Sequence, residues 1–228
     1  MAFDVKITTL FRPLDLLAPF TCRGCGALGE VLCERCKNYN VSAIPKMCPS
    51  CKANYKDCKC DVPIYAVSKR EGVLVDLVED YKYKSIRRAS EVLAELMDAG
   101  IQTCAKGGDL DGEVIVVPLP TVAKHIRERG FDHTLLLAKK LMKRHKGWKL
   151  CKMLDRNKNT VQVGTDGDKR REQAKDAYKL NKKVNINPNA TYLLIDDVWT
   201  TGASMESAIG IIKAAGAKKI AAAVILIP

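Results

Sequence analysis

The strongest constraint on the fold is an apolar run at residues 192–198, which reads YLLIDDV and ends in two adjacent acids. A run of this length and composition predicts a buried strand. The short loop WTTGA follows it, and apolar residues at helical spacing then predict a helix over 204–215, ended by Gly216. A buried strand that leads through a short loop into a helix is the building unit of a parallel α/β sheet.

The chain after residue 61 repeats this alternation of strands and helices. Strands joined by helices predict a mostly parallel sheet with helices on both faces. Ligands of such sheets bind at the carboxyl ends of the strands, so we expect the chemistry to follow residues 117 and 198. The other predicted strands are 64–67, 113–117, 148–154 and 220–227, and the other predicted helices lie within 73–81, 86–97 and 134–146.

The two acids and the loop after them are typical of a site for a sugar phosphate. The N–H groups of a Gly-containing loop and of a helix N-terminus form a cradle for an anion. Carboxylates repel phosphate but suit vicinal hydroxyl groups, bound directly or through Mg²⁺. We therefore predict a ribose 5-phosphate site, the alternative being acids that only cap the helix. The predicted ribose and Mg²⁺ ligands are Asp196 and Asp197, and the predicted 5-phosphate ligands are Thr200, Thr201, Gly202, Ala203 and Ser204.

Eight of the ten cysteines lie between residues 22 and 60, in pairs whose spacing is typical of structural zinc. Two C-x2-C pairs can complete one tetrahedron of thiolates, and the closer C-x-C spacing makes a second site a weaker prediction. Ligation that interleaves the first and third pairs, and free or disulfide-bonded thiols, remain alternatives. The first predicted site is Cys22, Cys25, Cys33 and Cys36, and the second is Cys48, Cys51, Cys58 and Cys60.

The composition changes abruptly near residue 61. Residues 1–61 are predicted to form a helical lead-in and a Cys-rich module that cannot build a core alone. Residues 62–228 are predicted to form the α/β domain. The lack of a long apolar run and of a signal peptide pattern argues against a membrane span and favours the cytoplasm. No internal repeat is evident, and His125, His133 and His145 lack ligand spacing, so we interpret them as surface or packing residues.

The basic charge of the chain is concentrated in one window. The net charge is +12, and residues 124–183 hold 19 Lys and Arg against seven Asp and Glu, so the whole excess lies there. Such a window favours a polyanionic partner, although a solvated basic face needs no partner. The candidate nucleic-acid contacts are Lys143, Arg144, Lys169, Arg170 and Arg171.

The segment 192–204 resembles the signature of type I phosphoribosyltransferases, and nearly the whole chain resembles the ComF/ComFC competence family. The further matching segments are the Cys pairs at 22–25 and 32–36, VVPLP at 116–120, RERGF at 127–131, QVG at 162–164, and residues 170–178. Two segments depart from the family pattern. The family usually has Gly-Phe-Asn-Gln where this chain has an Asp and a His at 132–133, and an Asn and a Gly are missing before Tyr178.

The resemblance implies a type I phosphoribosyltransferase-like domain that binds phosphoribosyl pyrophosphate with Mg²⁺, and an N-terminal region that binds one or two structural zinc ions. The loop after residue 117 would then hold the pyrophosphate, through backbone N–H groups such as that of Leu119 and the side chains of Arg127, Arg129 and Lys82. Residues 155–182 would form a basic lid over the site, the alternative being a plain surface loop.

The resemblance also implies a cytoplasmic factor of natural transformation that acts on internalised single-stranded DNA, with competence helicase and recombination proteins as partners. The alternatives are a conventional phosphoribosyltransferase that transfers phosphoribosyl to a base or amine, and a sensor that keeps the pocket without catalysis. The sequence contains no recognisable base-binding motif that would name an acceptor.

Overall fold

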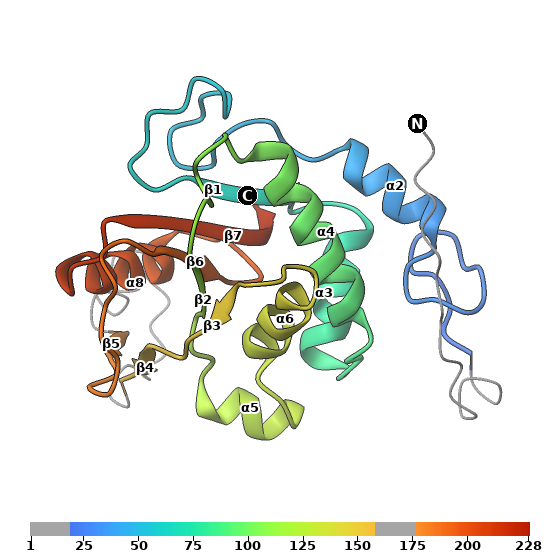
Figure 1. The fold of residues 1–228 in the computed structure, drawn as a ribbon. Helices are drawn as coiled ribbons and strands as arrows, with labels where there is room; N and C mark the ends of the chain where they lie inside the picture. Colours follow the sequence, from blue (N-terminus) through green and yellow to red (C-terminus); the bar gives the residue numbers. More distant parts are fainter. Residues whose placement is uncertain (1–18, 158–176) are drawn as a thin grey trace.

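The computed structural model describes residues 19–157 and 177–228, and its centre is a five-stranded sheet (Figure 1). The strand order is β1-β7-β6-β2-β3, and every neighbouring pair is parallel. A separate antiparallel pair joins β4 to β5. The strands are β1 Ile64–Lys69, β2 Val114–Pro118, β3 Lys149–Leu150, β4 Leu154–Arg156, β5 Tyr178–Leu180, β6 Thr191–Ile195 and β7 Lys219–Ile227.

Helices cover both faces of the central sheet (Figure 1). On one face α3, α4 and α6 pack against the strands, and on the other face α8 does so together with the β4–β5 pair. The prediction of a parallel α/β sheet with helices on both faces is therefore confirmed. The helices are α2 Glu34–Ser42, α3 Val73–Tyr83, α4 Ala89–Cys104, α5 Ala123–Arg129, α6 His133–Met142 and α8 Ala203–Ala214.

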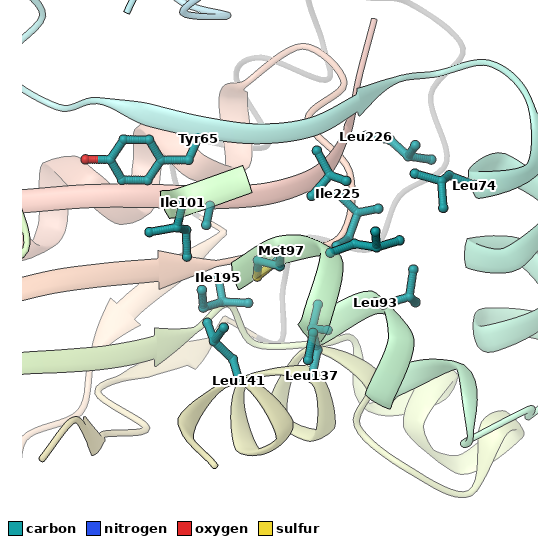
Figure 2. Packing of buried hydrophobic residues seen from close by; sticks show 14 of the residues in the cluster. Tyr65, Leu74, Leu93, Met97, Ile101, Leu137, Leu141, Ile195, Ile225 and Leu226 are labelled. Carbon is teal, nitrogen blue, oxygen red and sulfur yellow. The ribbon is translucent and has the colours of Figure 1, made fainter. Parts of the chain in front are cut away.

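Strand β6 is apolar throughout because it is buried from both sides. Ile195 belongs to the core under α4 and α6, where Figure 2 shows it with Met97, Leu137 and Leu141. The preceding residue, Leu194, belongs to the core under α8. Successive side chains of a strand point to opposite faces, so a strand between two helix layers needs apolar residues at every position.

The carboxyl ends of β2 and β6 lie at the same level of the sheet. Pro118 pairs with Ile195 in the parallel register, and the N–H of Leu119 donates to the carbonyl of Ile195 over 2.9 Å. The loops that follow the two strands therefore leave the sheet side by side. This register places the two segments from which we predicted the chemistry next to each other.

The predicted strand over 148–154 needs correction, because the structure splits it in two. Lys149–Leu150 pairs with β2, and the N–H of Cys151 still donates to the carbonyl of Val116 over 2.9 Å. Met153 and Leu154 instead belong to the core under α8 and start the β4–β5 pair. The chain leaves the central sheet here because these side chains are buried elsewhere.

The described residues before residue 61 share a core with the larger part. Leu32 is fully buried in the same cluster as α3 and α4, and the hydroxyl of Tyr55 donates to the carbonyl of Ile64 over 2.5 Å. Arg23 pairs with Asp80 of α3. The division at residue 61 stays a prediction, and the predicted lead-in lies almost entirely outside the described residues. Within the described ranges, no helix has the length and apolar character needed to cross a membrane.

Candidate functional site

The loop between β6 and α8 takes its shape from Gly202, the N-cap residue of α8. Its φ is +81°, and a Cβ atom there would lie 2.5 Å from the indole ring of Trp199. Side chains other than hydrogen are disfavoured at this φ, and the indole fills the space they would need. Ser204, which we expected near the N-cap, is the second residue of the helix.

The loop presents several backbone donors together. Within the described part of the chain, the N–H groups of Thr200, Thr201, Gly202 and Ser204 have no hydrogen-bond partner, while that of Ala203 lies 3.4 Å from the hydroxyl of Thr201. These donors lie at the start of α8, where the helix dipole adds positive potential. Such a group of donors can hold an anion.

Two adjoining hollows open beside this loop. The smaller one, of about 50 Å³, is bounded by the loop and the start of α8 and includes Thr200, Gly202 and Ser204. The larger one, of about 200 Å³, reaches towards the loop after β2 and includes Lys82 and Arg129. Asp196 and Ser204 line both hollows, so the two hollows adjoin at these residues. Thr201 and Ala203 of the predicted set line neither hollow.

The two adjacent acids occupy different environments, although we predicted the same role for both. Asp196 is half-buried and lines both hollows. Asp197 is buried and lines neither hollow, and its Oδ2 lies 2.8 Å from Nζ of Lys82 and 2.9 Å from Nε2 of His133. Neither contact has the angles of a good hydrogen bond. Asp196 therefore faces the ligand space, and Asp197 fixes the groups around it.

The same difference appears in the protonation of the two carboxyl groups. Burial and the charge of Asp197 raise the pKa of Asp196 above its usual range. Burial would also raise the pKa of Asp197, but His133 and the ammonium of Lys82 outweigh it and hold that pKa below its usual range. Asp197 therefore stays ionised, and Asp196 takes up a proton more readily than an ordinary aspartate.

The larger hollow is lined by three cations from distant parts of the chain. Lys82 comes from the end of α3, Arg129 from the end of α5, and Arg156 from β4. The guanidinium of Arg156 lies 5.5 Å from the ring centroid of Tyr178, which is buried and lines the same hollow. These cations outnumber Asp196, the acid that lines the same hollow, although Lys82 also pairs with Asp197, and the lining therefore favours an anionic ligand.

Two residues predicted for the pyrophosphate side need correction. The N–H of Leu119 donates to the carbonyl of Ile195, because it continues the β2–β6 ladder, and it is not free to bind an anion. Arg127 is exposed on α5 and does not line the cavity. Arg129, two residues later, lines the hollow, and so does Lys82; their role in binding pyrophosphate stays a prediction.

Our interpretation of His133 as a surface or packing residue was wrong. His133 is buried, lines the larger hollow and contacts Asp197. The sequence contains no motif that would have marked it, because its partner Asp197 is far away along the chain. Arg156 and the hydroxyls of Thr121 and Thr134 also line the cavity and were not predicted as ligands.

The residues present fit a magnesium ion only in part. Mg²⁺ usually binds through one or two carboxylates together with phosphate oxygens of the substrate. Asp196 can supply such a carboxylate to the cavity. One oxygen of Asp197 already faces an ammonium and an imidazole, so we assign Asp197 no direct metal ligation in this arrangement.

The eight N-terminal cysteines form two groups that fit structural zinc sites. Cys22, Cys25, Cys33 and Cys36 form one group and the last four form the other, with the sulfur atoms of each within 4.8 Å of one another. Sulfur pairs lie 3.5–4.0 Å apart, close to the edge of about 3.8 Å expected for a ZnS₄ tetrahedron with Zn–S bonds of about 2.3 Å. The grouping excludes the interleaved alternative, and four thiolates leave no open position for catalysis.

The two groups begin with the same short hairpin, although we identified no internal repeat. The N–H of Cys22 donates to the carbonyl of Ala27, and that of Cys48 donates to Ala53 at the matching position. The bridges Thr21–Leu28 and Met47–Asn54 also match. At the turn, Lys52 adopts a φ of +60° where the first hairpin has a glycine. The second halves differ, because in the first group Cys33 caps α2 and Cys36 lies within it, whereas no helix follows the second hairpin at the matching position.

The predicted nucleic-acid contacts are tested by the structure only in part. Lys143 is exposed at the end of α6, and Arg144 pairs with Asp98 of α4 over 3.0 Å. Lys169, Arg170 and Arg171 lie outside the described residues, as does most of the predicted lid. A DNA-binding role for this window therefore stays a prediction.

Comparisons with known proteins agree with the resemblance. Competence protein F of Haemophilus influenzae is 25% identical over 147 residues, which is 63% of this chain and 63% of that protein. The chain thus spans less than two thirds of its curated relative. A search against protein-family models gave no match. The resemblance to the competence family is confirmed as a similarity of sequence.

Two solved structures of phosphoribosyltransferases also match. The hypoxanthine phosphoribosyltransferase of Trypanosoma cruzi aligns over 64% of this chain and 66% of its own, with 11% identity and a TM-score of 0.37. That of Staphylococcus aureus aligns over 65% and 69%, with 14% identity and a TM-score of 0.35.

Proposed function

We propose that this protein binds phosphoribosyl pyrophosphate, or a related ribose 5-phosphate compound, in the cavity between the loops after β2 and β6. The observation that carries the proposal is the pair of hollows that share Asp196 and Ser204. The 5-phosphate would occupy the smaller hollow, and the ribose hydroxyls would face Asp196. The pyrophosphate would lie in the larger hollow.

The charges around the cavity support this orientation. The smaller hollow offers N–H groups and hydroxyls at the start of a helix, which suit one phosphate. The larger hollow offers Lys82, Arg129 and Arg156, which suit the greater charge of a pyrophosphate. When bound, Mg²⁺ would neutralise part of that charge, and Asp196 would supply its protein ligand.

Calorimetry tests the proposal directly. We expect the wild-type protein to bind phosphoribosyl pyrophosphate in the presence of Mg²⁺, and ribose 5-phosphate more weakly. At a pH above the raised pKa of Asp196, Asp196→Asn should weaken both about 10- to 100-fold, because hydrogen bonds to a charged acceptor contribute about 1.5–3 kcal/mol. Asp111→Asn, in an exposed loop away from the cavity, is the matched control. Equal binding by wild type and the Asp196 variant would remove Asp196 from the site.

The biological role that we propose is that of a ComF-type competence factor, which acts on internalised single-stranded DNA in natural transformation. The sequence similarity to Competence protein F supports the family, and the basic window 124–183 supports a polyanionic partner. Binding of a single-stranded oligonucleotide should weaken steeply as salt increases, since cations released from DNA drive such binding. Affinity that does not change between low and high salt would argue against the window as the DNA surface.

A conventional phosphoribosyltransferase is the second candidate, because the cavity keeps cations on the side where a pyrophosphate would leave. Under this hypothesis, pyrophosphate appears when phosphoribosyl pyrophosphate and an acceptor are both present. Pyrophosphate release can be measured with a panel of bases and amines and with the Asp196→Asn variant as the control. Ligand binding without release in any mixture would favour a binding or sensing role.

A further inference from the structure

The imidazole of His133 lies between two residues that serve opposite sides of the cavity. Its Nε2 lies 2.9 Å from Oδ2 of Asp197, at the tip of β6. Its Nδ1 lies 2.9 Å from NH1 of Arg129 and 3.1 Å from the hydroxyl of Thr121, both on the β2 side. The imidazole is therefore the one group among the described residues seen to contact both Asp197 and Arg129.

The chemistry of these neighbours favours one tautomer of the ring. A guanidinium can only donate hydrogen bonds, so the contact with Arg129 is a hydrogen bond only when Nδ1 carries no proton and accepts it. An unprotonated Nε2 would place its lone pair against the carboxylate of Asp197, which would be repulsive. These two contacts together favour the neutral tautomer with its proton on Nε2, the ring nitrogen that lies 2.9 Å from Oδ2 of Asp197.

The surroundings also hold the ring in place. The side chain of His133 is only 9% exposed, and the hydroxyl of Tyr81 donates to its backbone carbonyl over 2.6 Å. The ring of Tyr81 packs edge-on against the imidazole at 6.3 Å between centroids. On the far side of Asp197, Lys82 contacts the same oxygen over 2.8 Å. Arg129, His133, Asp197 and Lys82 therefore form a continuous row of polar contacts beneath the cavity.

We propose that His133 is a positioning residue whose neutral imidazole couples Arg129 on the pyrophosphate side to Asp197 on the ribose side. The row fixes the direction of Arg129 and, through Asp197, the positions of Lys82 and the adjoining strand tip. The effect on ligand binding rests on the proposed function, whereas the state of the ring does not. Removing the Arg129 side chain should therefore lower the affinity even for a ligand that has no pyrophosphate group.

The state of the ring can be measured in the ligand-free protein. We would record ¹⁵N NMR spectra of the full chain labelled at histidine, at pH 7.5, and assign the His133 signals by their loss in His133→Gln. We expect an unprotonated Nδ1 and a protonated Nε2, with His125 and His145 as internal references. Arg129→Ala should shift the His133 signals towards a mixture of tautomers. A proton on Nδ1 in the wild-type protein would overturn the proposal.

The coupling is measured with ribose 5-phosphate as the probe. We expect Arg129→Ala to weaken its binding about three- to tenfold in the wild-type background, and to have no further effect when combined with His133→Ala. His133→Gln should retain part of the coupling, because its amide can both donate and accept. Thermal melting of each variant shows whether it is folded. If Arg129→Ala leaves the affinity for ribose 5-phosphate unchanged, the coupling is refuted while the proposed site stands.

If the wild-type protein does not bind ribose 5-phosphate at all, the proposed function fails first. The NMR result then decides the remaining part of the proposal, the row of contacts itself.

Discussion

The two sides of the cavity are built in opposite ways. The side at β6 comes from one continuous segment, in which Asp196, Gly202 and Ser204 follow a single buried strand. The side at β2 is assembled from several segments, since Lys82 comes from α3 and Arg156 from β4. A continuous segment depends on local backbone geometry, and an assembled side depends on packing between elements. Substitutions on the two sides should therefore act through different physical effects.

We expect the largest effect at Asp197, because this residue belongs to the β6 segment by sequence but contacts residues of the β2 side. Asp197→Asn should lower the free energy of unfolding at neutral pH by about 3 kcal/mol, since it leaves the half-buried Lys82 without its counter-charge. The lowered pKa of Asp197 means that this stabilisation is present above about pH 4 and is lost on acidification. Denaturant unfolding at several pH values measures the effect.

The stability of Asp197→Asn should be compared with that of Asp196→Asn, which changes the neighbouring acid. The raised pKa of Asp196 means that its ionisation opposes folding as the pH rises above about 4. The variant should therefore be as stable as the wild type at neutral pH, or more stable. An equal loss of stability in both variants would contradict the division of roles between the two acids.

Gly202 tests the dependence of the β6 side on backbone geometry. Gly202→Ala should weaken binding of ribose 5-phosphate at least about tenfold, because a left-handed φ costs an L residue roughly 1–2 kcal/mol and the new Cβ meets Trp199. Gly210→Ala, within α8 where a Cβ meets nothing within 4 Å, is the control and should leave binding unchanged. Calorimetry on both variants decides whether the conformation of the loop matters.

Arg156 tests the β2 side, which is assembled from several segments. Arg156→Ala should weaken binding of pyrophosphate with Mg²⁺ about tenfold, because a charged hydrogen bond of roughly 1.5 kcal/mol or more is lost. Its effect on ribose 5-phosphate should be small, since the 5-phosphate lies on the other side. Arg127→Ala removes an exposed arginine outside the cavity and is the control. A loss of pyrophosphate affinity in the Arg127 variant would restore our original prediction for that residue.

The pH dependence of binding should give the smallest effect. If ligand hydroxyls or Mg²⁺ need an ionised Asp196, affinity should increase severalfold as the pH rises towards its raised pKa. The ligand phosphate also titrates, so the comparison is with Asp196→Asn, which shares the titration of the ligand only. Parallel pH profiles in the two proteins would show that the protonation of Asp196 does not control binding.

The sequence was sufficient for the parts of the molecule that depend on local order. The apolar run before Asp196, the loop glycine and the Cys-x2-Cys spacings each predict a structure from neighbouring residues alone. The segment 148–154 was harder, because its residues divide between two cores and the division depends on β5, which follows much later.

His133 could not be predicted as a site residue for the same reason. Its partner Asp197 follows β6, and the register of β2 with β6 brings Asp197 beside the segment that follows β2. Its other partner, Arg129, ends α5 only four residues before it. Leu119 shows the opposite case, since the sequence predicts its place at the strand end correctly but not that the ladder uses its N–H. Neighbouring residues determine where a residue lies along a strand or helix. Tertiary packing determines which N–H groups stay free and which side chains become buried partners.

The pairing of Pro118 with Ile195 has a consequence for the size of molecule that the protein can hold. Hydrogen-bonded strands lie about 4.8 Å apart, and neither strand can slide without breaking the ladder. The two loops are therefore held at a fixed separation where they leave the sheet. If the proposed function holds, a compound with a spacer longer than one pentose between its two anionic ends should bind with only one of those ends in place.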